Sequence, residues 1–85
     1  MGTKKLESEA GLFITPCSRI HTFFMKYSID VVYVDRSKIV VGIEENISPG
    51  KIGKRFNNAK SVIELPANTI QKTSLKVGQR IALID

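Results

Sequence analysis

The chain has 85 residues, 42% hydrophobic and 25% charged, with one cysteine and a formal net charge of +5. This composition indicates one small globular domain and excludes overall disorder, a membrane-spanning helix, an internal disulfide and a multi-cysteine zinc site. Residues 48–85 hold seven basic and two acidic side chains, so the whole positive excess belongs to the second half. Because the chain does not begin with a secretory signal, we expect a cytoplasmic protein, and we expect a monomer.

The first ten residues are polar and charged, and we expect 1–10 to be a flexible segment ahead of a single β-rich domain at 11–85. The apolar run at 11–15 ends at Pro16, which terminates a regular element. Residues 20–27 fit both helical and alternating spacing. Their aromatic content, and the strand that follows them, favour extended structure.

The segment 29–35, IDVVYVD, is the clearest strand, because five of its seven residues are β-branched or aromatic. Both of its faces are largely apolar, which predicts a central place in the sheet. A turn at 35–38 and a second strand at 39–47 complete a β-hairpin. Alternation in the second strand predicts two faces, formed by Ile39, Val41 and Ile43 and by Val40, Gly42 and Glu44.

Residues 48–60 form a long break with four basic residues and no acid. In a domain this small, such a loop is often functional or disordered. A strand at 61–65 follows, and then a short helix at 67–75, with Asn68 as N-cap and Gln71 at the capping-box position. A closing strand is predicted at 80–84. The fold class is therefore mostly β (α+β): a small barrel-like or strongly bent antiparallel sheet of about five or more strands with one short helix.

Three blocks of sequence carry a resemblance to a known family: ITPC..IHTFFMK..IDVV..D, VIELPA.TI and LKVGQRI. In this order they resemble the uncharacterised family named domain of unknown function 192, from about Gly11 to Leu83. The resemblance implies no agreed biochemical activity, and some relatives are exported. Relatives usually carry more residues before the first block, and they often differ at Ser37, Asn68 and Gln79.

The first candidate site lies in the most apolar stretch and consists of His21, Phe23, Lys26 and Asp30. These side chains either line a pocket for a small polar ligand or belong to a core strand whose Lys26 and Asp30 form a partly buried ion pair. Cys17 and His21 offer too few ligands for a metal, and we predict neither a metal nor a cofactor. A nucleophilic Cys17–His21 pair oriented by Asp30 would need contacts that spacing alone does not show.

The second candidate site is the basic loop, where four cationic side chains surround one aromatic residue, Phe56: Lys51, Lys54, Arg55 and Lys60. Such a loop could contact an anionic polymer, although no RNA-recognition, helix-turn-helix or P-loop signature is present. We favour a non-catalytic binding or accessory module for a small polar ligand or a protein partner. The alternatives are a weak binder of nucleic acid or anionic surfaces through residues 51–60, and a small hydrolase or cysteine-dependent enzyme. One histidine offers few titrating groups, so an enzyme is not expected.

Overall fold

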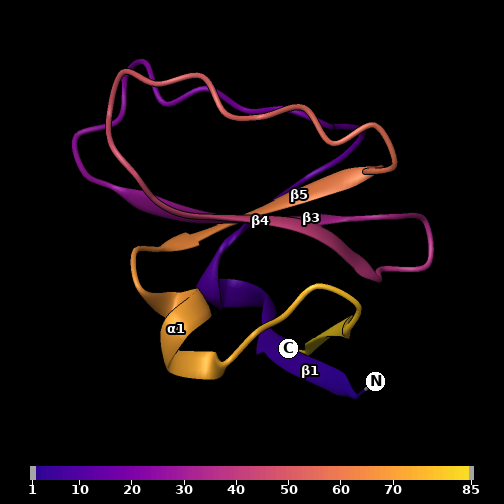
Figure 1. Ribbon diagram of the computed structural model, residues 1–85. Coiled ribbons are helices and arrows are strands. Elements are labelled where there is room, and N and C mark those ends of the chain that lie inside the picture. Colours follow the sequence, from indigo (N-terminus) through magenta and orange to yellow (C-terminus); the bar gives the residue numbers. More distant parts are fainter. Residues whose placement is uncertain (1, 85) are drawn as a thin grey trace.

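The computed structural model describes residues 2–84 and shows two β-sheets and one short α-helix (Figure 1). The strands are β1 (Thr3–Glu7), β2 (Leu12–Ile14), β3 (Ile29–Val34), β4 (Val40–Ile47), β5 (Ser61–Pro66) and β6 (Arg80–Ile84). A short 3-10 turn, η1 (Ser8–Ala10), follows β1, and the helix α1 (Thr69–Thr73) lies between β5 and β6. The predicted mostly β fold with one short helix is confirmed. The strands of the described residues form two separate sheets, not a closed barrel.

The larger sheet has four antiparallel strands in the order β2-β5-β3-β4. All residues of β3 are buried, because the apolar faces predicted for this strand both enter a core. Ile29, Val31 and Tyr33 pack in one cluster, and Val32 and Val34 pack in the other. The central position predicted for this strand is confirmed.

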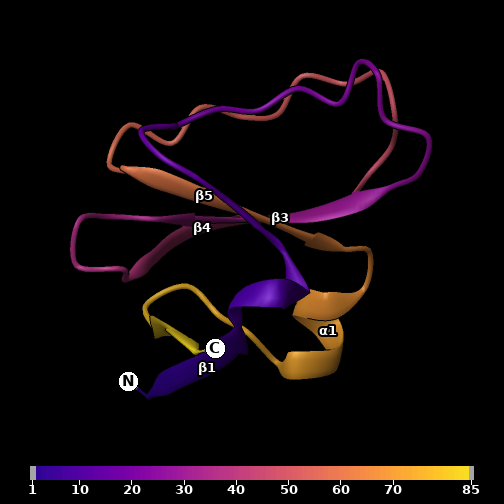
Figure 2. The same cartoon turned by 180° about the vertical axis from the view of Figure 1, so that it is seen from behind.

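The cluster that contains Val32 lies between the sheet and a second layer made of β1, β6 and α1 (Figures 1 and 2). In that layer β1 and β6 pair in parallel, with Leu6 opposite Leu83. The segment 1–10, expected to be flexible, therefore includes a strand. Leu6 explains this difference, because it is buried in the cluster together with Ile81 of the pairing strand.

The opposite face of the sheet is covered by two irregular segments, residues 15–25 and 48–60, which run side by side in both views (Figures 1 and 2). We call this pair of segments the strap. Backbone bonds join them, among them Thr22 N to Lys51 O at 2.8 Å and Gly53 N to Ile20 O at 2.9 Å. The extended structure predicted for 20–27 is wrong beyond His21, because Met25 N donates to Thr22 O and a turn follows.

Strand β4 does not alternate as predicted, because its register with β3 shifts between Tyr33 and Val34. The shift gives β4 one extra residue, as in a β-bulge. Val40 and Ile43 consequently pack against the same cluster, although strict alternation places them on opposite faces.

The helix is shorter than predicted, and its N-cap residue is the predicted one, but the capping bond differs from the expected one. Asn68 occupies the cap position with φ of 74° and makes no side-chain cap bond. Its Oδ1 atom instead accepts Asn46 Nδ2 at 3.1 Å. The first turn of α1 is capped from the central strand, where Asp30 Oδ2 accepts the backbone N–H of Ile70 at 2.8 Å.

Candidate functional site

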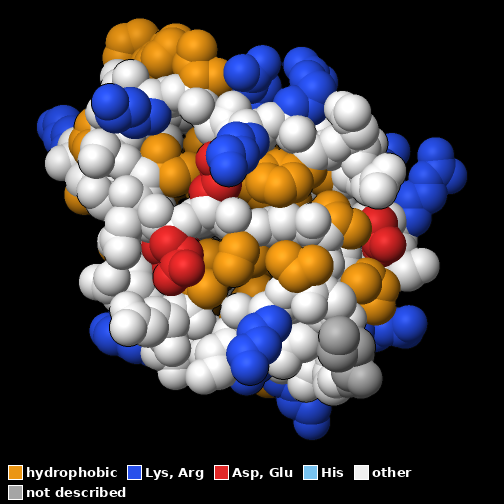
Figure 3. Space-filling view, in the orientation of Figure 1, with side chains coloured by type: hydrophobic (Ala, Val, Ile, Leu, Met, Phe, Trp, Pro, Cys, Tyr) orange, Lys and Arg blue, Asp and Glu red, His pale blue; other side chains and the backbone are white. Residues whose placement is uncertain are grey.

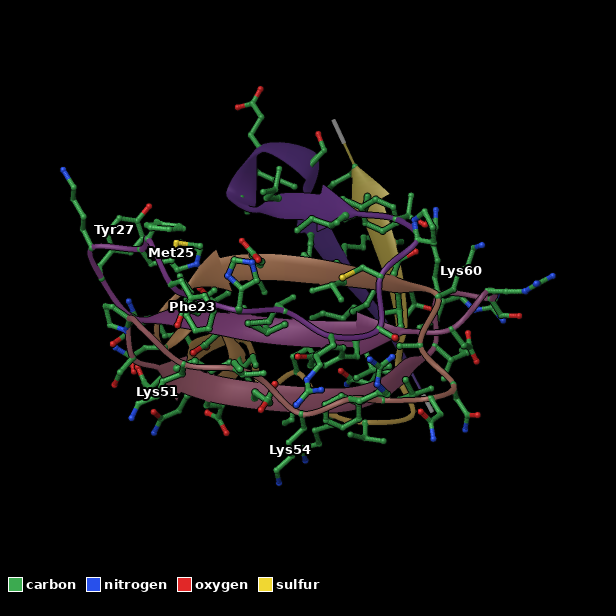
Figure 4. All side chains as sticks on the ribbon, turned by 90° about the horizontal axis from the view of Figure 1, so that it is seen from above. Phe23, Met25, Tyr27, Lys51, Lys54 and Lys60 are labelled. Carbon is green, nitrogen blue, oxygen red and sulfur yellow. The ribbon has the colours of Figure 1, made fainter. Side chains whose placement is uncertain are left out.

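An open cleft of about 500 Å³ lies between the β2–β5 edge of the sheet and the turn at residues 23–27. This volume falls within the range of small-molecule pockets. The side chains that shape the cleft are mainly apolar and come from three stretches of the chain: Leu12, Met25, Tyr27, Ile29, Glu64 and Pro66. Figure 4 shows Phe23, Met25 and Tyr27 gathered at one end of the strap, next to β5.

The alternation of side chains along β5 places Glu64 on the face of the sheet where the cleft lies. Ile63 and Leu65 are buried in the cluster under the sheet, so the residue between them faces the strap side. Gly11 lets the backbone before β2 approach β5 closely, because a Cβ atom at this position would meet the Glu64 carbonyl oxygen. Leu12 then pairs with Glu64 across the two strands. The cleft therefore has a carboxylate within a largely apolar lining.

Glu64 is half-buried, and no residue of the described range 2–84 donates a hydrogen bond to its carboxylate. Burial raises the pKa of this carboxyl group, and the charge of His21 opposes that effect. Sequence reasoning missed Glu64, although a single acid inside the apolar run SVIELP was a visible signal.

Two of the predicted ligand-binding residues stack on each other in the segment beside the cleft, although neither is among its lining residues. The rings of His21 and Phe23 stack with centroids 4.8 Å apart and planes inclined by 29°. Both side chains are exposed, and Lys26 is exposed on the same turn. The structure thus gathers His21, Phe23 and Lys26 on one short segment, and their role in binding stays a prediction.

Asp30, the fourth predicted residue, lies on the other side of the sheet. It is fully buried, and its carboxylate accepts backbone N–H groups from Asn46 at 2.9 Å and from Ile70 at 2.8 Å. These two bonds take the place of the expected ion pair with Lys26. Because both oxygens are occupied by backbone donors, Asp30 supports the fold at the start of α1 and does not line the cleft.

Cys17 belongs to the first segment of the strap, where it is half-buried and its thiol donates to Arg19 O at 3.0 Å. His21 stacks on Phe23 and Asp30 binds backbone, so the three residues of the considered nucleophilic set have separate partners. Within residues 2–84, no three His, Cys, Asp or Glu side chains come together in a way that could hold a metal ion.

The basic loop forms the outer segment of the strap, and its four cationic side chains are all exposed: Lys51, Lys54, Arg55 and Lys60. They do not gather, because Lys51 and Lys60 lie at opposite ends of the strap (Figure 4). Phe56 packs on Tyr33 with ring centroids 4.2 Å apart and lies over Gly42. The Phe56 ring is therefore not free to stack on nucleic-acid bases in this structure.

Beneath the strap, the Tyr33 hydroxyl donates to Glu44 Oε1 at 2.6 Å, and the backbone N–H of Lys54 donates to Glu44 Oε2 at 3.1 Å. Burial, followed by the bond to Glu44, raises the pKa of Tyr33 well above its ordinary value. The phenol is consequently a persistent donor. This contact fastens the basic loop to β3 and β4 and leaves neither side chain available to the cleft.

The model of the family described as "DUF192: Uncharacterized ACR" matches residues 1–83. A UPF0127 protein of Thermococcus sibiricus is 36% identical over 62 residues, which are 73% of this chain and 40% of that protein. A UPF0127 protein of Pyrococcus abyssi is 37% identical over 65 residues, 76% of this chain and 55% of that protein. The chain thus spans about half the length of the curated relatives it matches. No solved structure is significantly similar to it. In the described part of the chain, no helix has the length and apolar character required to cross a membrane.

Proposed function

The chain belongs to the uncharacterised DUF192 family, as its sequence blocks indicated, and from that premise we propose that it is a non-catalytic binding module. Its ligand is a small polar molecule, or an exposed side chain of a protein partner, that enters the cleft beside Glu64. The observation that carries this proposal is a cleft of about 500 Å³ whose apolar lining surrounds one half-buried carboxylate. Ligand sites typically combine an apolar wall with a few polar groups that fix orientation.

The exposed aromatic residues beside the cleft also support a binding role. Phe23 and Tyr27 are 49% and 67% exposed, and both belong to one short turn. The space-filling view shows hydrophobic side chains projecting over this end of the strap (Figure 3). Exposed apolar groups gathered at one place often mark an interaction site.

A titration of ¹⁵N-labelled protein with a panel of amines, amino acids, carboxylates and monosaccharides tests the proposal. We expect at least one class to shift the amide signals of Met25, Tyr27 and Glu64 in a saturable way. Phe24 is the internal reference, because its side chain is exposed but does not line the cleft. Saturable shifts confined to another part of the protein, or none at millimolar concentration, would overturn it.

The alternative is weak association of the basic loop with nucleic acid or anionic surfaces. Its support is the exposure of Lys51, Lys54, Arg55 and Lys60 on one segment. Two observations argue against a dedicated nucleic-acid site. The charges are far apart along the strap, and the Phe56 ring packs against Tyr33. A cytoplasmic location and a monomeric state stay predictions from the sequence.

A further inference from the structure

We propose that the ligand of the cleft ends in an alkylammonium group and that Glu64 is its counter-ion. This inference rests on the proposed function of the cleft and names the chemical class that it binds. The ammonium could belong to a free amine or to a lysine side chain of a partner protein, because both present the same cation on an apolar stem.

The charge balance of the cleft points to a cation. Glu64 is the charged residue among the described residues that line it, and no Lys or Arg side chain of residues 2–84 pairs with its carboxylate. The sequence carries 13 Lys and Arg residues, so cationic side chains are plentiful elsewhere on the surface. The charge of His21 offsets only part of the cost of holding this carboxylate partly out of water, because burial remains the larger effect on its pKa. A cation supplied from outside would remove that disadvantage.

The walls of the cleft suit the same chemistry. Met25 and Tyr27 line it, and the stacked rings of His21 and Phe23 belong to the same segment of the chain without lining the cleft. Aromatic faces attract organic cations, and Met and Leu side chains accommodate an alkyl stem. The lining therefore offers one group for the charge and several for the carbon chain.

Other ligand classes match the cleft less well. A carboxylate or phosphate would meet the negative charge of Glu64, which is disfavoured in a partly buried site. A sugar presents many hydroxyl groups, whereas Tyr27, Ser28 and Glu64 are the polar side chains among the lining residues. A neutral alcohol would occupy the apolar part but would leave the carboxylate unpaired.

Three probes of matched length separate these possibilities: n-pentylammonium, n-pentanol and pentanoate. We expect n-pentylammonium to shift the amides of Met25, Tyr27 and Glu64 with an affinity about tenfold above that of n-pentanol, a difference equal to about 1.4 kcal/mol. Pentanoate should not bind. The peptide acetyl-Gly-Lys-Gly-amide, tested beside n-pentylammonium, distinguishes a lysine side chain from a free amine.

Paired variants make the test specific. Glu64→Gln keeps the shape of the side chain, and it should remove the tenfold preference for the ammonium while n-pentanol binding is retained. Glu45→Gln, on the exposed part of β4, is the matched control and should change nothing. Tyr27→Leu should weaken ammonium binding, whereas Phe24→Leu should not.

The outcomes separate the cation assignment from the proposed binding function of the cleft. Equal binding of n-pentanol and n-pentylammonium in the cleft would overturn the cation assignment and leave the binding function standing. Tighter binding of pentanoate would do the same. Failure of all three probes, together with a negative panel, would overturn both proposals.

Discussion

Asp30 and Asp35 each accept two backbone N–H groups near the ends of the central strand, but they use their oxygens differently. Asp30 uses one oxygen for each bond, whereas Asp35 Oδ1 alone accepts both Ser37 N at 2.8 Å and Ile39 N at 3.0 Å. We expect Asp30→Asn to lower the free energy of unfolding by about 2 kcal/mol, because one buried N–H then faces an amide donor. Asp35→Asn keeps the one oxygen needed and should lose less than about 1 kcal/mol. Urea unfolding followed by circular dichroism measures both; equal losses would contradict the assignment.

Glu64 should make the stability of the protein depend on pH. Its pKa is raised by burial, so the folded protein binds this proton more tightly than the unfolded chain does. The stability tied to the protonated group is therefore present below the ordinary carboxyl pKa and is lost as pH rises through the raised value. Near pH 7, Glu64→Gln should raise the free energy of unfolding, by less than about 1 kcal/mol because the group is only half-buried and solvent screens its charge.

The same variant near pH 3.5 should show a smaller gain, since Glu64 is then protonated in both states. Urea unfolding at the two pH values, with Glu45→Gln as control, is the measurement. A gain that is equal at both values would show that new contacts of the introduced amide, and not the removal of a partly buried charge, stabilise the variant.

Among the elements, the strap depends on Thr22. This side chain is fully buried, and its hydroxyl donates to Ser48 O at 2.6 Å and accepts Lys51 N at 2.9 Å. Thr22→Val removes both bonds without a change of volume, which should cost about 1–3 kcal/mol. We expect hydrogen exchange of the Gly53 and Phe56 amides to accelerate more than exchange in β3, because the strap can open locally. Thr22→Ser keeps the hydroxyl and should behave like the native protein; acceleration of the same size in both variants would count against this role.

The sequence correctly predicted the elements whose structure depends on their own residues and not on distant parts of the chain. Strand β3 is apolar on both faces and is buried on both, and the Asp35 turn carries its own acceptor. The helix cap escaped prediction because its acceptor, Asp30, comes from a strand about forty residues away in the chain.

The candidate site was only partly predictable for the same reason. His21 and Phe23 stack on each other beside a cleft, but neither lines it, and their role in binding stays a prediction. Asp30 is near His21, Phe23 and Lys26 in the sequence, but its side chain points to the opposite face of the sheet because side chains alternate along β3. Glu64 enters the site only once the turn at 23–27 folds over β5, and that turn depends on contacts with the distant 48–60 segment.

At the scale of the whole molecule, the net charge of +5 is dispersed. Lysine and arginine side chains appear around the outline of the face in Figure 3 without forming one patch. We expect nucleic acid to bind no tighter than about 10⁻⁵ M near physiological salt, the level of non-specific association. Fluorescence anisotropy with a mixed single- and double-stranded pool measures this. Changing Lys51, Lys54, Arg55 and Lys60 to Gln should remove the weak binding and leave the fold intact; sub-micromolar, sequence-dependent binding that disappears in this variant would establish the nucleic-acid alternative.

The parallel pairing of β1 with β6 has a consequence for the order of folding. All four strands of the larger sheet lie between Leu12 and Pro66, so that sheet can form from one continuous stretch of chain. Leu6 and Ile81, which help to cover one of its faces, flank that stretch on either side. This face therefore stays uncovered until β1 meets β6, and exposed apolar surface on a partly folded chain is prone to aggregate. Two strands that are far apart in the sequence thus protect the sheet that the residues between them form.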